Sequence, residues 1–226
     1  VTIGTGDQNV NTNGATYVAY IFAGGESTAA TAKSVEFDAS GDFLNIQTTS
    51  SDLEMGTSDF TVEAWIYPQD RDTANWNCIF TCTSDLQLTW KEKAIKFYAP
   101  GIALTTPEVF RVRQWHHVAV TRSGTKYTLW VNGIREDEGT NSQAIPGLSG
   151  TYPSIGAKNS SSDYFWGKIS NLRVLKGTAL YTSAFKPPTK PLTSITNTKL
   201  LCCNNSSVTG STVAPASIAS GGNPEA

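Results

Sequence analysis

The chain has 226 residues, a formal net charge of −2 at pH 7 and only 16% charged residues. Without a basic excess or a Lys/Arg run, it lacks the positive field that a phosphate backbone or an anionic membrane attracts, and we expect no nucleic-acid partner. No apolar stretch approaches the roughly 20 residues that span a bilayer, so we expect no membrane insertion either.

Residues that favour strands and turns are abundant, and helix formers are scarce. Period-two alternation predicts a first strand in ATYVAYIFA, residues 15–23. SVEFD and FLNIQ then flank a turn at residues 39–42, which predicts a hairpin. DFTVEAWIYP, residues 59–68, is the next strand, and CIFTC, LQLTW and AIKFYAP continue the pattern at short intervals.

The alternation also assigns faces to the side chains. In residues 59–68, one face carries Val62, Ala64 and Ile66, and the opposite face carries Glu63 and Trp65. Trp65, like Trp130 further along the chain, is expected in the core or covering a sheet rather than in a sugar platform.

The stretch WHHVAVTRSGTKYTLWVNGIRE, residues 115–136, contains two adjacent histidines. On a strand His116 and His117 point to opposite sides, so they cannot share a metal or act together as acid and base. Asn132-Gly133 is the strongest short hairpin signal in the chain, because both central residues of a type I′ turn need positive φ. We therefore expect two strands and their turn, with structural histidines.

The C-terminal third predicts further strands in GKISNLRVL, in TKLLCCNN and in STVAPASIAS. Between the first two, GTALYTSAFKPPTKPL contains three prolines and cannot form a central strand, so we expect an irregular arm that crosses an edge. About a dozen short strands separated by turns predict an all-β fold, an antiparallel sandwich of two sheets.

The four cysteines are Cys78, Cys82, Cys202 and Cys203. Neither near-neighbour pair suits an internal disulfide, because Cys78 and Cys82 would lie roughly 13 Å apart on a strand and a bond between sequence neighbours is strained. The spacing matches no zinc pattern. Reduced, partly buried thiols are the favoured interpretation, and a disulfide between the two groups is the alternative.

Four stretches in order, SVEFDASGDFLNI, DFTVEAWIYP, WHHVAVTRSGTKYTLWVNG and IGAKNSSSDYFWGKISNLRVLKGTALYTSAFKPPTKPL, carry a family resemblance. Together they resemble the laminin-G-like domain of the concanavalin A-like lectin/glucanase superfamily, over about residues 32–205. The resemblance implies a jelly-roll sandwich and two parts of the chain. Residues 1–25 would close a preceding module and form a linker, and residues 26–226 would form the laminin-G-like domain with its closing strands.

The segments VTIGTGDQNVNTNGATYVAYIFA and KGTALYTSAFKPPTKPLTSITNTKLL are similar to modules of bacteriophage virion proteins, especially tail and fibre components. This resemblance implies a virion structural or adhesion module with host-surface glycans or other virion proteins as partners. A virion spacer or decoration domain, or a carbohydrate-binding accessory domain of a secreted bacterial protein, are the alternatives. Homo-oligomerisation stays open, because the sequence has neither heptads nor a collagen-like period.

The carboxylates argue against glycoside hydrolysis. Retaining hydrolases need two carboxyl groups about 5 to 5.5 Å apart in one cleft, which an E-x-D-x-E strand provides. Here Glu63 stands alone on its strand, and Glu136, Asp137 and Glu138 alternate sides after a turn, as on a solvated edge. We therefore expect that the chain is not an enzyme.

Binding is the remaining chemistry, and two loops supply its residue types. Sugars are recognised by aromatic faces and by Asn, Asp and Tyr groups on loops. The candidate ligand-binding residues are Asn159, Asp163, Tyr164 and Trp166 in GAKNSSSDYFWG, and Asp72, Asn75 and Trp76 in RDTANWN. The alternative is that these aromatic residues only plug the ends of the sandwich.

A calcium ion is common at the rim of laminin-G-like domains, and Asp70 and Asp72 are candidate oxygen donors for one. Two aspartates in a turn are usually only a turn, so neither a metal nor another cofactor is claimed.

Overall fold

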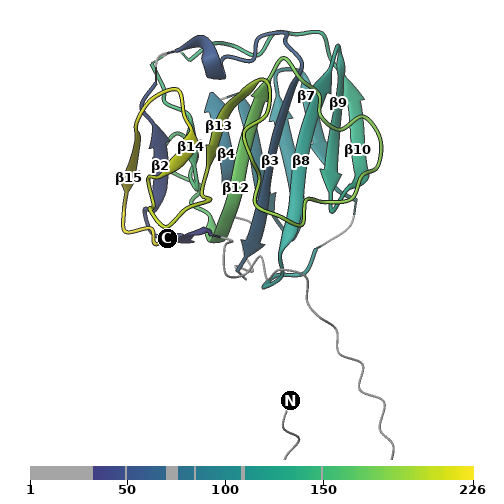
Figure 1. Cartoon of the computed structure of the whole chain (residues 1–226). Coiled ribbons are helices and arrows are strands. Elements are labelled where there is room, and N and C mark those ends of the chain that lie inside the picture. The colour runs from purple at the N-terminus through teal and green to yellow at the C-terminus, as the bar shows by residue number, and fades with distance from the viewer. Residues whose placement is uncertain (1–32, 49, 70–75, 84, 108–109, 149) are drawn as a thin grey trace, which may run out of the picture.

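The computed structural model describes residues 33–226 except 49, 70–75, 84, 108–109 and 149 (Figure 1). The expected strand at residues 15–23 and the module boundary at residue 25 lie outside this part of the chain. Within it, two antiparallel sheets pack face to face, so the predicted β-sandwich is confirmed. The described residues contain no helix that is long and apolar enough to cross a membrane.

The first sheet, called here the eight-stranded sheet, is built around the longest strand, β12. In spatial order its strands are β10 (Ile134–Thr140), β9 (Lys126–Val131), β8 (His116–Ser123), β3 (Phe60–Pro68), β12 (Trp166–Lys176), β13 (Thr198–Cys202) and β14 (Ser211–Val213). β1 (Val35–Asp38) also pairs with β12, along the half that β13 leaves open.

The second sheet, called the seven-stranded sheet, lies behind the first in Figure 1. In spatial order its strands are β15 (Ile218–Gly221), β2 (Phe43–Ile46), β11 (Ser154–Ile155), β4 (Asn77–Thr83), β5 (Leu86–Lys91), β6 (Ala94–Ala99) and β7 (Ile102–Thr105). A single turn of 3-10 helix, η1 (Ser51–Leu53), precedes β3. The strand predicted in TKLLCCNN is present as β13. The segment STVAPASIAS, expected as one strand, instead forms two, β14 in the first sheet and β15 in the second.

Alternate side chains of each strand fill the space between the sheets, as period-two patterning predicts. In β3, Val62, Ala64 and Ile66 are fully buried in the core cluster. Leu88 of β5 and Phe97 of β6, in the other sheet, belong to the same core cluster and are also fully buried. The apolar core therefore lies between the inner faces, and the residues that alternate with it point to the two outer faces.

The expected hairpin at Asn132-Gly133 is present and joins β9 to β10. Both residues have positive φ, +51° and +80°, which is the conformation that a type I′ turn requires. His116 and His117 point to opposite sides of β8, as predicted: His116 stacks on Trp90 of the other sheet, and His117 packs on the outer-face residue Trp65.

The expected hairpin around residues 39–42 is wrong. β1 pairs with β12 in the eight-stranded sheet, whereas β2 pairs with β11 and β15 in the seven-stranded sheet. The turn, in which Ala39 and Gly41 both have positive φ, thus carries the chain from one sheet to the other. Alternation along a strand assigns the faces of that strand but not its hydrogen-bonded neighbour, which explains the error.

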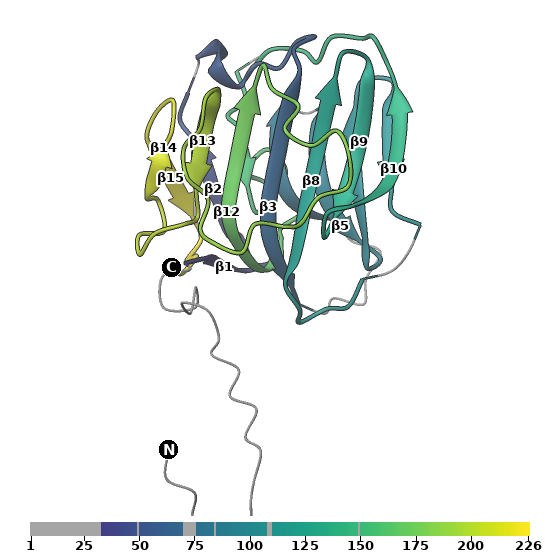
Figure 2. The ribbon, with the colours of Figure 1, turned by 45° about the vertical axis from the view of Figure 1, so that its right-hand side comes forward.

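The proline-containing segment after β12, residues 177–197, is irregular as predicted, and we call it the arm. It does not follow an edge, however: it crosses the outer face of the eight-stranded sheet in front of β3 and β8 (Figures 1 and 2). Thr61 of β3 donates a hydrogen bond to the Thr178 carbonyl, and the Phe185 N–H donates one to the Gly133 carbonyl. The arm is therefore a third layer that covers part of one outer face.

All four cysteines are free and buried, which confirms the favoured interpretation. The Sγ atoms of Cys202 and Cys203 lie 3.9 Å apart, beyond the length of a disulfide. Burial raises the pKa of Cys82 to about 12, so this thiol stays protonated at neutral pH.

Candidate functional site

The outer face of the seven-stranded sheet carries a hollow of about 420 Å³, and we call it the sheet hollow. Its lining residues are Trp76, Asp85, Gln87, Tyr98, Ala99, Pro100, Lys158 and Asp163. The volume lies within the range of small-molecule sites. The hollow thus combines two aromatic rings with carboxylate, amide and ammonium groups.

Strand register places the floor of the sheet hollow. Gln87 of β5 is the register partner of Tyr98 of β6, so the two side chains lie next to each other. Both alternate with residues that are fully buried in the core, Leu88 and Phe97 among them. Because successive side chains on a strand point to opposite faces, Gln87 and Tyr98 must point outward.

Trp76, directly before β4, provides the aromatic wall. Its ring centroid lies 5.3 Å from that of Tyr98, with the rings at 68°, an edge-to-face arrangement. The Lys91 Nζ atom lies 4.2 Å from the indole centroid, and this cation–π contact also fixes the ring. An indole held on two sides keeps its orientation before a ligand arrives, which lowers the entropy lost on binding.

The opposite wall is the loop between β11 and β12, which carries Lys158 and Asp163. The loop turns sharply at Asn159 and Ser160, which both have positive φ, and the Ser161 N–H donates to the Lys158 carbonyl at 3.1 Å. The Asp163 carbonyl accepts a 2.7 Å hydrogen bond from the N–H of Cys78 in β4, which ties the loop to the sheet.

Of the predicted binding residues, the structure brings Trp76 and Asp163 together in the sheet hollow. Asn159, Tyr164 and Trp166 belong to the same loop but do not line the hollow. The Asn159 Oδ1 atom is buried without a hydrogen-bond partner among the described residues, and Trp166 is already the first residue of β12. Asp70, Asp72 and Asn75 lie outside the described residues.

Sequence reasoning missed six lining residues, among them the polar residues Asp85, Gln87, Tyr98 and Lys158. The available signal was alternation, because Gln87 and Tyr98 are polar residues at the outward positions of LQLTW and AIKFYAP. The sequence does not reveal that these two strands are neighbours of Trp76 and of the loop at residues 156–165.

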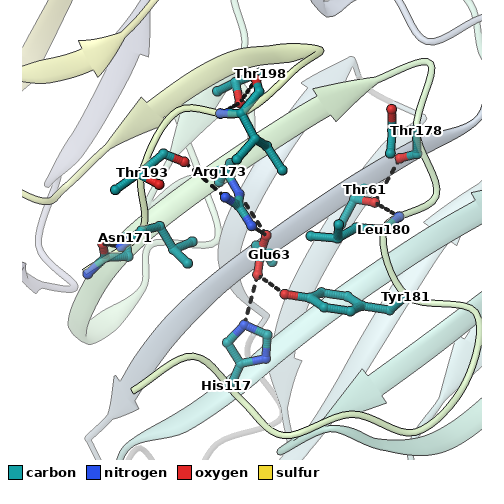
Figure 3. A network of polar contacts seen from close by, with 12 residues as sticks. Thr61, Glu63, His117, Asn171, Arg173, Thr178, Leu180, Tyr181, Thr193 and Thr198 are labelled. Atoms are coloured by element: carbon teal, nitrogen blue, oxygen red, sulfur yellow. Dashed lines mark hydrogen bonds and ion pairs between the residues drawn. The ribbon is translucent and has the colours of Figure 1, made fainter. Parts of the chain in front are cut away.

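Beneath the arm lies a second concentration of polar side chains, centred on Glu63 (Figure 3). Glu63 Oε1 accepts hydrogen bonds from Arg173 Nε at 2.8 Å and Nη2 at 2.6 Å. Glu63 Oε2 accepts from His117 Nε2 at 3.0 Å and from the Tyr181 hydroxyl at 2.7 Å. Glu63 and His117 are fully buried, and we call these four residues the Glu63 cluster.

In the Glu63 cluster, the buried carboxylate of Glu63 is stabilised in its charged form by Arg173 and by hydrogen bonds. Burial by itself raises the pKa of Glu63, but the hydrogen bond from His117 and the charge of Arg173 outweigh it and lower that pKa. Burial and the Glu63 charge raise the pKa of Tyr181. A carboxylate only accepts, so the His117 Nε2 atom carries the proton in this bond.

The Glu63 cluster fastens the arm to the sheet. Tyr181 belongs to the arm, and Arg173 Nη1 donates a 3.0 Å bond to the carbonyl of Thr193, near its far end. The expectation of a buried, hydrogen-bonded structural His117 is confirmed. Among the described residues, no group of three or more His, Cys, Asp or Glu side chains is arranged to hold a metal ion.

The family model described as the concanavalin A-like lectin/glucanases superfamily, of the laminin G type, matches residues 38–181. The chain belongs to this superfamily. A comparison with curated proteins finds no match.

One solved structure shows the same fold, and two others have a lower similarity. A "putative carbohydrate binding protein" from Bacteroides ovatus is similar, with a TM-score of 0.68 and 19% identity over 86% of this chain and 58% of that one. Domains LG4-5 of mouse laminin α1 have a TM-score of 0.49 and 16% identity over 72% and 47% of the two chains. A heptameric SAP-like pentraxin from Limulus polyphemus has a TM-score of 0.48 and 19% identity over 67% and 79%.

Proposed function

We propose that this chain is a non-enzymatic carbohydrate-binding domain and that the sheet hollow is its ligand site. The observation that carries the proposal is the pair of fixed aromatic rings, Trp76 and Tyr98, surrounded by Asp85, Asp163 and Lys158. Aromatic faces bind the C–H surfaces of sugar rings, and the polar groups around them bond the hydroxyls. The name of the B. ovatus protein, which shares the fold, agrees with this function.

Glu63, the carboxylate at the centre of the Glu63 cluster, is not available for catalysis, which supports a non-enzymatic role. Glu63 is fully buried, and each of its oxygens already accepts two hydrogen bonds within the Glu63 cluster. A general acid or nucleophile has to reach the scissile bond, which Glu63 cannot do beneath the arm.

In the whole protein, we further propose, this domain serves host attachment as part of a bacteriophage virion, on a tail fibre or another appendage. The resemblance of residues 1–23 and of residues 176–201 to segments of phage virion proteins supports this placement. Its ligand would then be a host-surface glycan. A spacer domain of the same virion would not need an open aromatic hollow, so a test of glycan binding distinguishes the two roles.

A glycan array followed by titration calorimetry tests the binding function. We expect saturable binding of at least one glycan, weakened about tenfold or more by Trp76→Ala or Tyr98→Ala, because one stacking ring contributes on the order of 1.4 kcal/mol. Tyr152→Ala is the matched control, since Tyr152 is 40% exposed and lies outside the hollow. The absence of binding across a broad panel would support the spacer role instead.

A further inference from the structure

A second hollow, of about 480 Å³, lies on the outer face of the eight-stranded sheet, where the arm passes β12. We call it the arm pocket. Trp65 of β3 and Trp115, directly before β8, provide its aromatic surface, and Pro188 of the arm also lines it. Lys33 and Lys190 approach from two different segments. Trp115 is 38% exposed, an unusual value for so large an apolar side chain.

Hydrogen bonds hold the walls of the arm pocket in place. The Ser170 hydroxyl donates to the carbonyl of Lys33, which fixes the start of β1 against β12. Asn171 Oδ1 accepts from the N–H of Leu192 at 2.7 Å, and its Nδ2 donates to Ser170 Oγ at 2.8 Å. These bonds occupy the polar groups of Ser170 and Asn171. The pocket therefore offers a ligand the indole faces, the ammonium groups of Lys33 and Lys190, and the hydroxyls of Ser34 and Thr189.

The segment that forms much of the arm pocket carries only positive charge. Residues 164–224 contain six Lys or Arg and no Asp or Glu. Three of the six have carboxylate partners elsewhere: Lys168 with Glu36, Arg173 with Glu63, and Lys199 with Asp52.

The lysines of the arm and of the pocket are not neutralised in this way. Lys186 and Lys190 on the arm, and Lys33 at the pocket, have no carboxylate oxygen within ion-pair distance in the part of the chain that the structure describes. No carboxylate is among the described residues that line the pocket. Within this part of the chain, the arm pocket therefore lacks a counter-charge of its own.

We propose that the arm pocket binds a saccharide that carries a carboxylate, that is, a uronic-acid-containing glycan. The C–H face of the sugar ring stacks on Trp65 and Trp115, and the carboxylate pairs with Lys33 and Lys190. A neutral sugar could bond the hydroxyls of Ser34 and Thr189 but would leave both ammonium groups without a counter-charge.

This site is independent of the sheet hollow, so the two proposals can fail separately. The sheet hollow contains Asp85 and Asp163, whose charges disfavour a carboxylate ligand. The two hollows lie on opposite outer faces of the sandwich and share no residue.

Titration calorimetry of the intact chain with oligogalacturonate, oligomannuronate and hyaluronan fragments tests the arm pocket. We expect at least one of these uronates to bind, with its methyl ester at least about tenfold weaker, which corresponds to about 1.4 kcal/mol. Binding should weaken with rising salt concentration. The variants Trp115→Ala and Lys190→Ala, both at exposed positions, should lower the affinity without changing the unfolding midpoint.

Lys186→Ala is the matched control, because it removes the same charge from the same arm outside the pocket. Trp76→Ala should leave uronate binding unchanged, which separates this site from the sheet hollow. The proposal is overturned if no uronate binds, if acid and ester bind equally, or if Lys186→Ala and Lys190→Ala act alike. It is also overturned if size-exclusion chromatography shows a dimer that Trp115→Ala abolishes, since a second copy then fills the pocket.

Discussion

The two outer faces of the sandwich use charged residues in opposite ways. On the eight-stranded sheet, the arm covers the Glu63 cluster, and every oxygen of the carboxylate is bonded to the protein itself. On the seven-stranded sheet, Asp163, Lys158 and Trp76 surround a hollow that is open to solvent. One set of polar groups completes the fold, and the other is available to a ligand.

The comparison shows that the residue type alone does not distinguish structural from functional polar groups. Glu63 with His117 has the composition of a catalytic pair, yet the third layer formed by the arm removes both side chains from solvent. Gln87 and Tyr98 look like ordinary outward residues of a sheet, yet no further layer of the described residues covers the hollow that they line. What covers an outer face therefore decides what its residues can do.

Removing the Glu63 carboxylate should have the largest effect on stability. Glu63→Ala leaves Arg173, which is 5% exposed, buried without its partner, and we expect a loss of about 3–5 kcal/mol in the free energy of unfolding. Urea denaturation followed by tryptophan fluorescence measures it. Glu138→Ala is the control, because Glu138 pairs with Lys126 and Arg135 at the exposed edge strand and should matter little. Equal losses of unfolding free energy in the two variants would mean that the Glu63 cluster stabilises the fold no more than an exposed ion pair does.

Low pH should lower the free energy of unfolding by protonating Glu63. The folded-state pKa of Glu63 lies below its ordinary value of 4.5, so its stabilisation is complete above about pH 4.5 and is lost as the pH falls through the lower folded-state value. We expect the stability gap between the natural chain and Glu63→Gln to be wide at neutral pH and to narrow below about pH 4.5. A gap of constant width, measured by urea denaturation across this range, would rule out a charged Glu63 in the folded state.

Tyr181→Phe should have an intermediate effect. It removes the hydroxyl that donates to Glu63 at 2.7 Å but keeps the ring that stacks on Phe185, with centroids 3.6 Å apart. A hydrogen bond to a charged group contributes about 1.5–3 kcal/mol, and we expect a loss of this size together with faster proteolysis of the arm. Tyr152→Phe, at an exposed position, should change neither. Unchanged proteolysis in Tyr181→Phe would show that the arm is held elsewhere.

Alanine substitutions of the two glycines that flank β9 distinguish the cost of backbone strain from the cost of losing contact with the arm. Gly124 and Gly133 both have positive φ, but a Cβ at Gly124 meets nothing, whereas one at Gly133 meets the carbonyl of Phe185. Alanine at either position costs about 1–2 kcal/mol of strain. Gly133→Ala also displaces the hydrogen bond from the Phe185 N–H, and we expect it to lose about 0.5–1.5 kcal/mol more. Equal thermal unfolding of the two variants would contradict the docking of the arm at this turn.

The sequence was sufficient for the fold class because alternation is a local property. Val62, Ala64 and Ile66 point inward in the structure as their spacing predicts, and Asn132-Gly133 forms the expected turn. Strand pairing is not local. The turn at residues 39–42 has good hairpin chemistry, but its two strands find partners far along the chain, β12 for the first and β11 and β15 for the second.

The sites were harder to predict than the fold for the same reason. Glu63 is separated by 110 residues from Arg173 and by 118 from Tyr181, so the sequence shows a lone carboxylate where the structure has a cluster. Trp76 and Asp163 could be selected by residue type, since aromatic and acidic residues in loops suit sugar binding. Their neighbours Gln87 and Tyr98 required knowledge of which strands lie beside them.

The smallest effect is expected in thiol labelling of the native chain. The reactivity of Cys78 tests whether the sheet hollow is already formed before a ligand binds. Cys78 lies beneath the hollow's loop, its N–H bonded to the Asp163 carbonyl, and burial together with the Asp163 charge raises its pKa. At neutral pH we expect a disulfide reagent such as DTNB to label none of the four thiols of the native chain, because thiolates are the reactive form, and to label all four in urea. Labelling of Cys78 alone under native conditions would mean that this loop opens in solution. The sheet hollow would then form around its ligand, and the contrast between a covered face and a preformed open one would no longer hold.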